Sequence, residues 1–459
     1  MKPLTLKRIA DAVGGTVKNK FQYIRVNGVT TDSRKDDLTG ALFVAIAGDN
    51  FDGHDFAREA VIKGAACIMA ERRLDTLHPV ITVPSTREAL KKLAAYYRSL
   101  FDVHMVAVTG SVGKTTTKDM IAQVLSARYK TLKTEGNYNN DIGLPLSVFR
   151  LDDSYQAAVF ELGMNHPGEI RQLSAIVQPT VCVITNIGVA HIENFRNREG
   201  ILNAKTEIFE YMAEDGHIIL NGDDDLLTTI QPQKRQIHYF GKHHNNYYSA
   251  FNIKNNGLIG VSCTVKYGDN QFKTNIPLPG SHMVDNALAA VAVGDILGLD
   301  AGSVKNGLES VRPLKMRMDV RNAPGGVTLI NDVYNASPAS VMAGLDVLAG
   351  VGSRKVCILG DMLELGENSL AYHRDVGAYA ASKAIDAIVC VGAHSRETYN
   401  GAKNNAAPAV TCAHYEDQDA LLNELESYIR EGDTVLVKAS RSLKFERTAE
   451  AIMNRGTNG

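Results

Sequence analysis

A glycine-rich loop that ends in lysine and threonine is the clearest chemical signal in this sequence. It lies between the apolar run HMVAV and the helix-like run KDMIAQVL and comprises Gly110, Ser111, Val112, Gly113, Lys114, Thr115 and Thr116. A turn between a strand and a helix points backbone N–H groups and the positive helix end at a phosphate. We expect Lys114 to reach the terminal phosphates and Thr115 to hold Mg²⁺. Val108 stands where the common phosphate-loop pattern has glycine, so the loop is a variant.

Polar residues follow the next two apolar runs. Glu161 ends the run AAVFE, and Asn186 and His191 follow TVCVIT. If these runs are parallel strands, their carboxyl ends share one sheet edge with the phosphate loop, where a carboxylate could hold Mg²⁺. A surface acid and a structural histidine remain the alternatives. Lys205, in the helix-like ILNAKTEIFEYM, has no distinguishing feature of its own.

Three α/β segments must position these residues. Residues 1–100 combine the helical spacing of LTLKRIADAVGG with strand-like runs such as ALFVAIAG, which predicts a small α/β domain. Residues 101–312 predict a mostly parallel sheet with a long Ala-rich helix, and residues 236–280 are interpreted as an antiparallel excursion from it. Residues 313–459 contain VTLIND, KVCILGD, AIVCVG and TVLVKAS between helical stretches, which predicts a third, doubly wound Rossmann-like domain.

Composition excludes several classes of protein. The 459 residues are 44% hydrophobic and carry a net charge of −2, which predicts a globular protein without a nucleic-acid or membrane-surface partner. The six cysteines form no C-x-x-C pair, and no run of 18 apolar residues occurs. We therefore expect a protein of the reducing cytoplasm.

Seven segments in order resemble the Mur ligase family of ATP-dependent peptidoglycan precursor ligases over nearly the whole chain. They are TGSVGKTT, NYNNDIGLPL, ELGMNHPGEI, TNIGVAHIENF, AKTEIFE, GSHMVDNALAA and DVYNASP. TDSRKDDL and LGDMLELG are similar to members that join D-alanyl-D-alanine to a UDP-N-acetylmuramoyl-tripeptide through an acyl phosphate. The third residue of the tripeptide, lysine or diaminopimelate, stays open.

The resemblance implies a role for many individual residues. It implies UDP binding by Thr31, Asp32, Ser33 and Arg34, and ATP binding by the phosphate loop with Asn286, Arg317 and Asp332. It also implies contacts to the substrates from Asn137, Asn139, Asn140, Tyr334 and Asn335. For Asp361 and Glu364 we hypothesise a place in the dipeptide pocket, with a helix N-cap as the alternative for Asp361.

The resemblance further implies two Mg²⁺ ions, one at Thr115 and Glu161 and one at His191. Lys205 matches a lysine that many members carry as a carbamate, although an unmodified Lys205 could instead pair with phosphates. The implied catalytic residues are Lys114, Glu161, His191, Lys205 and Arg317, in a monomer. Domain closure is expected, because the phosphate loop and Arg317 fall in different predicted domains.

Three other functions remain open. One is another amide ligase of the family or of the folylpolyglutamate type, against which LGDMLELG argues. A phosphate-loop switch or motor ATPase would need no UDP-binding domain. A dinucleotide oxidoreductase is disfavoured because no strand is followed by a clean G-x-G-x-x-G with an acid about 20 residues on.

Overall fold

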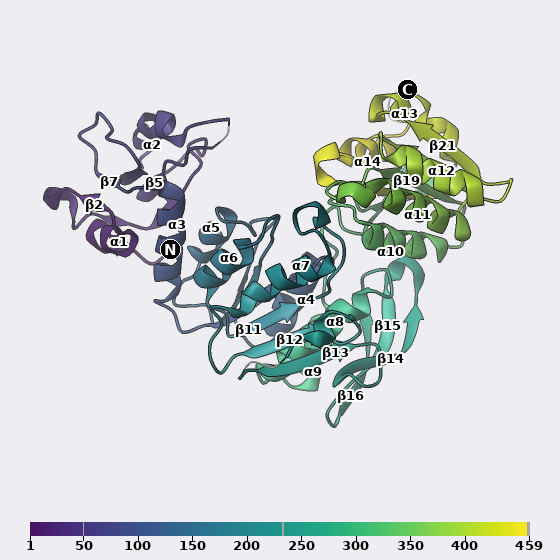
Figure 1. The fold of residues 1–459 in the computed structure, drawn as a ribbon, viewed down its shortest axis with the longest axis horizontal. Helices are drawn as coiled ribbons and strands as arrows, with labels where there is room; N and C mark the ends of the chain where they lie inside the picture. Colours follow the sequence, from purple (N-terminus) through teal and green to yellow (C-terminus); the bar gives the residue numbers. More distant parts are fainter. Residues whose placement is uncertain (49, 232–233, 457–459) are drawn as a thin grey trace.

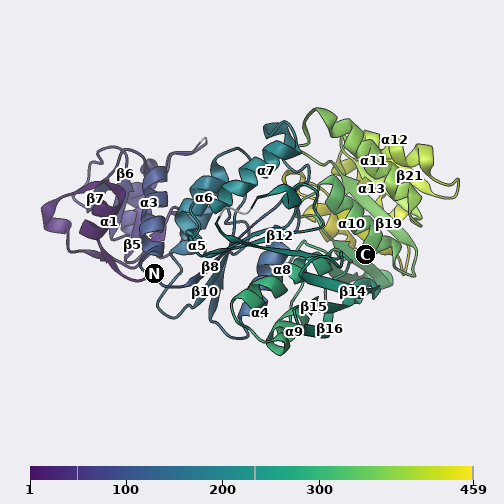
Figure 2. The same cartoon turned by 60° about the horizontal axis from the view of Figure 1, so that its bottom comes forward.

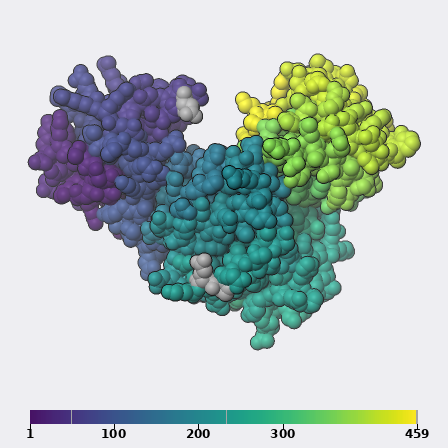
Figure 3. Space-filling view, viewed as in Figure 1, coloured from purple at the N-terminus to yellow at the C-terminus, as the bar shows by residue number. Residues whose placement is uncertain are grey.

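The structure, a computed structural model, describes residues 1–48, 50–231 and 234–456. Three parts follow one another along an arch, each built around its own sheet (Figure 1). A space-filling view shows the molecule hollowed between the N-terminal and C-terminal parts, above the central part (Figure 3). The predicted three-part α/β architecture is confirmed.

The N-terminal part holds a five-stranded sheet in the order β2-β7-β6-β5-β4, parallel except for β2. Its strands are β1 (Leu4–Thr5), β2 (Thr16–Val17), β3 (Arg25–Val26), β4 (Gly28–Thr30), β5 (Ala41–Val44), β6 (Cys67–Ala70) and β7 (Val80–Thr82), of which β1 and β3 pair separately. Its helices are α1 (Leu6–Val13), α2 (Ala57–Ile62) and α3 (Thr86–Arg98). The apolar face predicted for α1 is buried, and Gly14 ends that helix in the left-handed conformation, at φ 70°.

The central part holds a nine-stranded sheet in the order β16-β15-β14-β13-β12-β11-β8-β10-β9. Its strands are β8 (His104–Thr109), β9 (Thr131–Lys133), β10 (Ala157–Glu161), β11 (Val181–Ile184), β12 (His217–Asn221), β13 (Gln236–Gly241), β14 (Tyr248–Asn255), β15 (Val261–Tyr267) and β16 (Asn270–Ile276). Strands β8, β10 and β11 are parallel neighbours, as predicted. The expectation for residues 236–280 was partly wrong, because β13 and β14 continue the parallel sheet and only β15 and β16 are antiparallel.

Helices cover this sheet and end in the loops of the site. They are α4 (Lys114–Leu125), α5 (Gly143–Val148), α6 (Glu169–Val177), α7 (Arg198–Thr206), α8 (Met283–Ile296) and α9 (Ala301–Glu309). The Ala-rich helix α8 is apolar around most of its circumference because it is enclosed by α4, α9 and the sheet. Figures 1 and 2 both show α3 of the N-terminal part beside α5 and α6.

The C-terminal part holds a six-stranded sheet in the order β17-β18-β22-β19-β20-β21, parallel except for β17. Its strands are β17 (Asp319–Ala323), β18 (Val327–Asn331), β19 (Lys355–Gly360), β20 (Ala387–Val391), β21 (Thr411–Tyr415) and β22 (Thr434–Lys438). Its helices are α10 (Pro338–Ala349), α11 (Ser369–Ser382), α12 (Ser395–Asn405), α13 (Gln418–Tyr428) and α14 (Glu446–Met453). The four predicted strands are present, and the half-exposed edge strands β17 and β21 were missed. Among the described residues, none of the helices has the length and apolarity needed to cross a membrane.

Candidate active site

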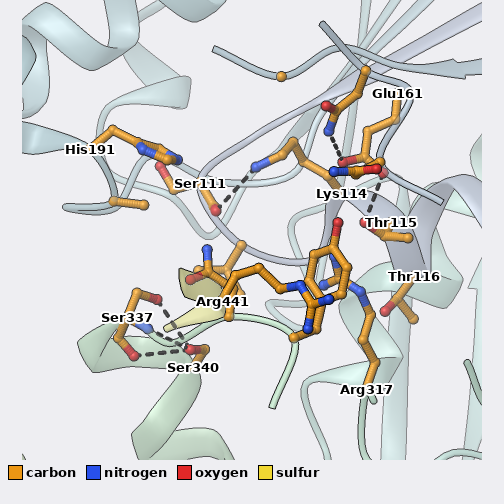
Figure 4. A pocket seen from close by; sticks show the side chains of 18 of the residues that line it. Ser111, Lys114, Thr115, Thr116, Glu161, His191, Arg317, Ser337, Ser340 and Arg441 are labelled. Carbon is orange, nitrogen blue, oxygen red and sulfur yellow. Dashed lines mark hydrogen bonds between the residues drawn. The ribbon is translucent and has the colours of Figure 1, made fainter. Parts of the chain in front are cut away.

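One cavity of about 850 Å³ is lined by residues of all three parts. Figure 4 shows residues of the central and C-terminal parts that line it. Most of the predicted site residues line it, namely Ser111, Val112, Gly113, Lys114, Thr115, Thr116, Asn137, Asn139, Asn140, Glu161, His191, Asn286, Arg317, Asp332, Tyr334, Asn335 and Glu364. Those of the central part, except Asn286 of α8, follow β8, β9 and β11 or end β10, as expected for the carboxyl edge of parallel strands. The cavity is large enough for a nucleotide-sized ligand.

The phosphate loop approaches its neighbours so closely that two positions require glycine. Gly110 has φ 148°, and a Cβ there would lie 1.9 Å from Thr185 Oγ1. Gly113 has φ 85° and would place a Cβ 2.7 Å from Asn286 Oδ1. Larger residues at either position would clash and strain the backbone, so these glycines fix the conformation of the loop.

Asn186 braces the loop from the end of β11. Its Oδ1 accepts the Val112 N–H at 2.9 Å and its Nδ2 donates to the Val112 carbonyl at 3.0 Å. Nearby, Ser111 Oγ accepts the Gly188 N–H at 2.8 Å. The segment after β11 therefore holds the phosphate loop, which follows the neighbouring strand β8. The sequence predicted the position of Asn186, but not this role.

Lys114 is folded back on its own loop. Its Nζ donates to the Gly110 carbonyl at 2.8 Å. Burial lowers the pKa of its amine, and the charge of Arg317 acts in the same direction, while Glu161 opposes the change. A phosphate would add a second anionic partner for this amine.

Glu161 and Thr115 form an oxygen pair at the start of α4. Thr115 Oγ1 donates to Glu161 Oε2 at 2.7 Å, and Asn139 Nδ2 donates to Glu161 Oε1 at 2.8 Å. Glu161 is only 3% exposed. A hydroxyl and a carboxylate oxygen held this close suit a hard divalent cation such as Mg²⁺, so the residues present fit the predicted metal.

Lys205 is buried in α7 with a relative exposure of 2% and does not line the cavity. Over the described ranges, its amine has no hydrogen-bond or ion-pair partner. Burial holds the pKa of this amine well below its ordinary value, and the nearby charge of Lys114 lowers it further. A buried lysine without an anionic partner favours the neutral amine.

His191 contacts the C-terminal part. Its Nδ1 lies 2.5 Å from the Glu364 carboxylate. This contact lowers the pKa of Glu364, and burial of the carboxyl opposes the shift only in part. Both residues have positive φ, at 63° and 64°. The predicted metal ligand and the predicted dipeptide-pocket residue therefore face each other across the boundary between two parts.

Arg317 is presented by an unusual turn. The flanking Met316 and Met318 have φ of 62° and 47°. Asp332 fixes this turn, because its Oδ1 accepts the Met318 N–H at 3.1 Å while its Oδ2 pairs with Lys438 Nζ at 2.5 Å. The Arg317 guanidinium lies 3.9 Å from the centre of the Tyr334 ring.

Five predicted site residues of the outer parts lie away from the cavity. Thr31, Asp32, Ser33 and Arg34 follow β4 in the N-terminal part, where Asp32 binds the Arg34 side chain through bonds of 2.8 and 3.0 Å. Hydrogen bonds from Arg34 lower the pKa of Asp32 to about 2. Asp361 is buried, and its Oδ1 accepts the Ser395 N–H at 2.7 Å, at the start of α12.

Several cavity residues were missed by the sequence reasoning. They are Arg87, His282, Ser337, Ser340, Lys438 and Arg441. Lys438 ends the predicted strand TVLVK, so the rule that placed Glu161 could also have found it. Arg87 lies in the first turn of α3, where a surface arginine would look the same.

Three family models match the chain in order. They are "Mur ligase family, catalytic domain" over residues 25–98, "Mur ligase middle domain" over 108–294 and "Mur ligase, glutamate ligase domain" over 316–441.

Three named proteins are similar over nearly the full length. The UDP-N-acetylmuramoyl-tripeptide–D-alanyl-D-alanine ligase of Bacillus subtilis (strain 168) is 37% identical over 98% of both chains. The structure of UDP-N-acetylmuramoylalanyl-D-glutamyl-2,6-diaminopimelate–D-alanyl-D-alanyl ligase from Acinetobacter baumannii matches with a TM-score of 0.86, at 33% identity over 99% of both chains. The MurF ligase from Thermotoga maritima in complex with ADP matches with a TM-score of 0.82, at 29% identity over 93% of this chain and 97% of that one. The chain belongs to the Mur ligase family.

Proposed function

We propose that the protein is an ADP-forming ligase that joins D-alanyl-D-alanine to a UDP-N-acetylmuramoyl-tripeptide, as the named relatives do. The observation that carries this proposal is the single cavity that unites the phosphate loop, the Thr115 and Glu161 oxygen pair and Arg317. Relatives that share this name over the full length favour it over a folylpolyglutamate-type ligase.

ATP is the co-substrate of this reaction. The free N–H groups at the start of α4 and the amine of Lys114 suit its phosphates. Asn286 and Asp332 line the same cavity and are proposed nucleotide contacts. The similarity to a ligase solved with ADP supports this assignment.

Amide formation proceeds in two steps. First, an oxygen of the tripeptide's terminal carboxylate attacks the γ-phosphorus, and the bond to the bridging oxygen of ADP breaks. Then the amine of the dipeptide attacks the acyl carbon, loses a proton, and inorganic phosphate leaves with one carboxylate oxygen. The two reacting groups of the first step are anions, so the positive charges of Lys114 and Arg317 stabilise their approach.

Thr115 and Glu161 would hold one Mg²⁺, which neutralises phosphate charge when bound. His191 is the proposed ligand of a second ion through its Nε2, because its Nδ1 faces the Glu364 carboxylate.

Lys205 is proposed to carry a carbamate. Its lowered pKa favours the neutral amine that can attack CO₂, forming an N–C bond and releasing one proton. The product is an anion, which the positive charge of the nearby Lys114 would stabilise. Modification would thus provide the charge partner that this buried side chain lacks.

The N-terminal part is proposed to bind the UDP end of the tripeptide nucleotide, and the C-terminal part is proposed to bind the dipeptide. Thr31 to Arg34 would bind the UDP group, and Glu364 would line the dipeptide pocket together with Tyr334. We also propose domain limits near residues 100 and 312. We further propose a monomer that acts in the cytoplasm, where ATP and nucleotide precursors are available.

ADP release tests the proposed function. The purified protein is incubated with Mg-ATP and with the tripeptide nucleotide, D-alanyl-D-alanine, both or neither. Release that requires both acceptors is expected. Equal release without either acceptor would favour a phosphate-loop ATPase, and release with a single amino acid would favour another ligase of the family.

A further inference from the structure

The cavity continues from the phosphate loop toward the N-terminal part. Arg87 and Lys91 of α3, Asp141 of the NYNND loop and Gln172 of α6 line this extension. Under the proposed function, UDP binds in the N-terminal part and the activated carboxylate lies at the phosphate loop. The peptide of the substrate must therefore pass along this wall.

The two cations of the wall, Lys91 and Arg87, differ in how many of their hydrogen-bond donors already have a partner. Lys91 is 9% exposed, and its amine contacts Glu88 at 2.5 Å and Gln172 at 2.6 Å. The Arg87 side chain is 47% exposed, and within the described residues its one partner is Asp141, at 3.0 Å through a single Nη1. A guanidinium has five N–H donors. Most donors of Arg87 are thus available to a ligand inside the cavity.

The loop that contacts Arg87 also contacts the reaction centre. Asp141 follows Asn139 by two residues, and the Asn139 amide contacts Glu161 at 2.8 Å. Adjacent Cα atoms are 3.8 Å apart, so those of Asn139 and Asp141 are separated by at most about 7.6 Å. Arg87 and Glu161 line the same cavity, so a tripeptide activated beside Glu161 can extend toward Arg87.

The substrate supplies a suitable anion. A tripeptide such as the alanyl-D-glutamyl-2,6-diaminopimelate named for the A. baumannii ligase keeps one glutamyl carboxylate outside its peptide bonds. A diaminopimelate third residue adds another spare carboxylate. We propose that Arg87 binds a spare carboxylate of the tripeptide, one that is not activated, and that Asp141 holds the guanidinium in place until the substrate arrives.

Replacement of Asp141 by a substrate carboxylate on Arg87 has a clear physical basis. The guanidinium fork can bind both oxygens of a carboxylate, whereas its contact with Asp141 is made through one nitrogen. Asp141 is 30% exposed and can turn to solvent when displaced. Arg87 would then help select peptides that carry the spare carboxylate. This inference rests on the proposed function.

Calorimetric titration of tripeptide nucleotides into Arg87→Gln and the unaltered protein, without ATP, tests the inference. Three nucleotides are compared. The peptide of the first contains glutamyl and lysine, that of the second glutamyl and diaminopimelate, and that of the third an amidated glutamyl and lysine. We expect Arg87→Gln to weaken binding of the first two about tenfold, and to leave binding of the third unchanged because it has no spare carboxylate. A loss confined to the diaminopimelate peptide would identify its distal carboxylate as the anion bound.

Arg150→Gln is the matched control. Arg150 also pairs with a carboxylate, that of Glu135 at 2.8 Å, its side chain is 42% exposed, and it lies outside the cavity. It should bind all three nucleotides normally. Arg87→Lys keeps the charge and should recover part of the affinity, and melting temperatures verify folding. Equal weakening of all three nucleotides in Arg87→Gln, or no weakening, would overturn the inference. Because this readout is binding, it is separate from the ADP-release test of the proposed function.

Discussion

Lys205 shows at the residue scale how a buried charge depends on its surroundings. Its resemblance to a modified lysine was the only signal in the sequence, since a helix-borne lysine is usually solvated. The structure adds burial and the absence of any partner among the described residues. Burial is the main cause of its lowered pKa, and the charge of Lys114, 91 positions earlier, lowers it further, so residue type alone could not have supplied either cause.

Carbon-13 NMR in labelled bicarbonate tests the modification. The unaltered protein is expected to give a carbamate carbon signal that Lys205→Met lacks. Lys118→Met is the control, because Lys118 is also buried but its amine already donates to the Thr134 carbonyl at 2.7 Å. It should keep the signal. A signal of equal intensity in Lys205→Met would show that Lys205 carries no carbamate.

His282 makes stability depend on pH. It lines the cavity, and burial lowers its pKa from 6.5 to about 4. The folded protein therefore keeps the ring neutral while the unfolded chain binds a proton below about pH 6.5. Its contribution, up to about 3 kcal/mol, is present above pH 6.5 and is lost as the pH falls toward 4.

Thermal unfolding between pH 7.5 and 4.5 measures this effect. His282→Gln should lose less stability on acidification than the unaltered protein. The exposed His244 provides the control, and His244→Gln should behave like the unaltered protein. Parallel pH profiles for all three proteins would contradict the assignment.

At the scale of elements, the strand ends position the chemistry. Strands β8, β10 and β11 were predictable because each is a short, continuous apolar run buried on both faces. Strand β13 was misjudged because its first four residues are not fully buried, which lets polar residues enter a parallel strand. The contact of Asp361 could not be predicted from the sequence either. Asp361 follows β19 as predicted, but its partner, the Ser395 N–H, is 34 residues away along the chain.

The turn that carries Arg317 should depend on Asp332. Removal of the acceptor for the Met318 N–H in Asp332→Ala would release the turn and lower kcat/KM for ATP by roughly 100-fold, as in Arg317→Ala. Steady-state kinetics of the double variant should give a loss close to that of the single variants. Asp332→Asn keeps an acceptor oxygen and should lose less. Fully multiplicative losses would mean that the two residues act independently.

The whole molecule must bring distant sites together. Arg317 already lines one cavity with Lys114, so the C-terminal part is close to the phosphate loop. The residues proposed to bind UDP lie outside this cavity, after β4 of the N-terminal part, and a hollow separates the N-terminal and C-terminal parts (Figure 3). A substrate that reaches both sites should therefore draw the N-terminal part inward.

Small-angle X-ray scattering measures this closure. With a non-hydrolysable ATP analogue and the tripeptide nucleotide together, the radius of gyration should fall below that of the protein with either ligand alone. Scattering curves that do not change at saturation would show that the arch is rigid.

Oxygen transfer tests the central claim most directly. The tripeptide nucleotide is labelled with ¹⁸O in its terminal carboxylate and incubated with Mg-ATP and D-alanyl-D-alanine, and the products are analysed by mass spectrometry. We predict a pentapeptide nucleotide and inorganic phosphate that carries one oxygen from the labelled carboxylate. Phosphate without the label, or ADP formed without the pentapeptide, would contradict activation of the substrate carboxylate by ATP.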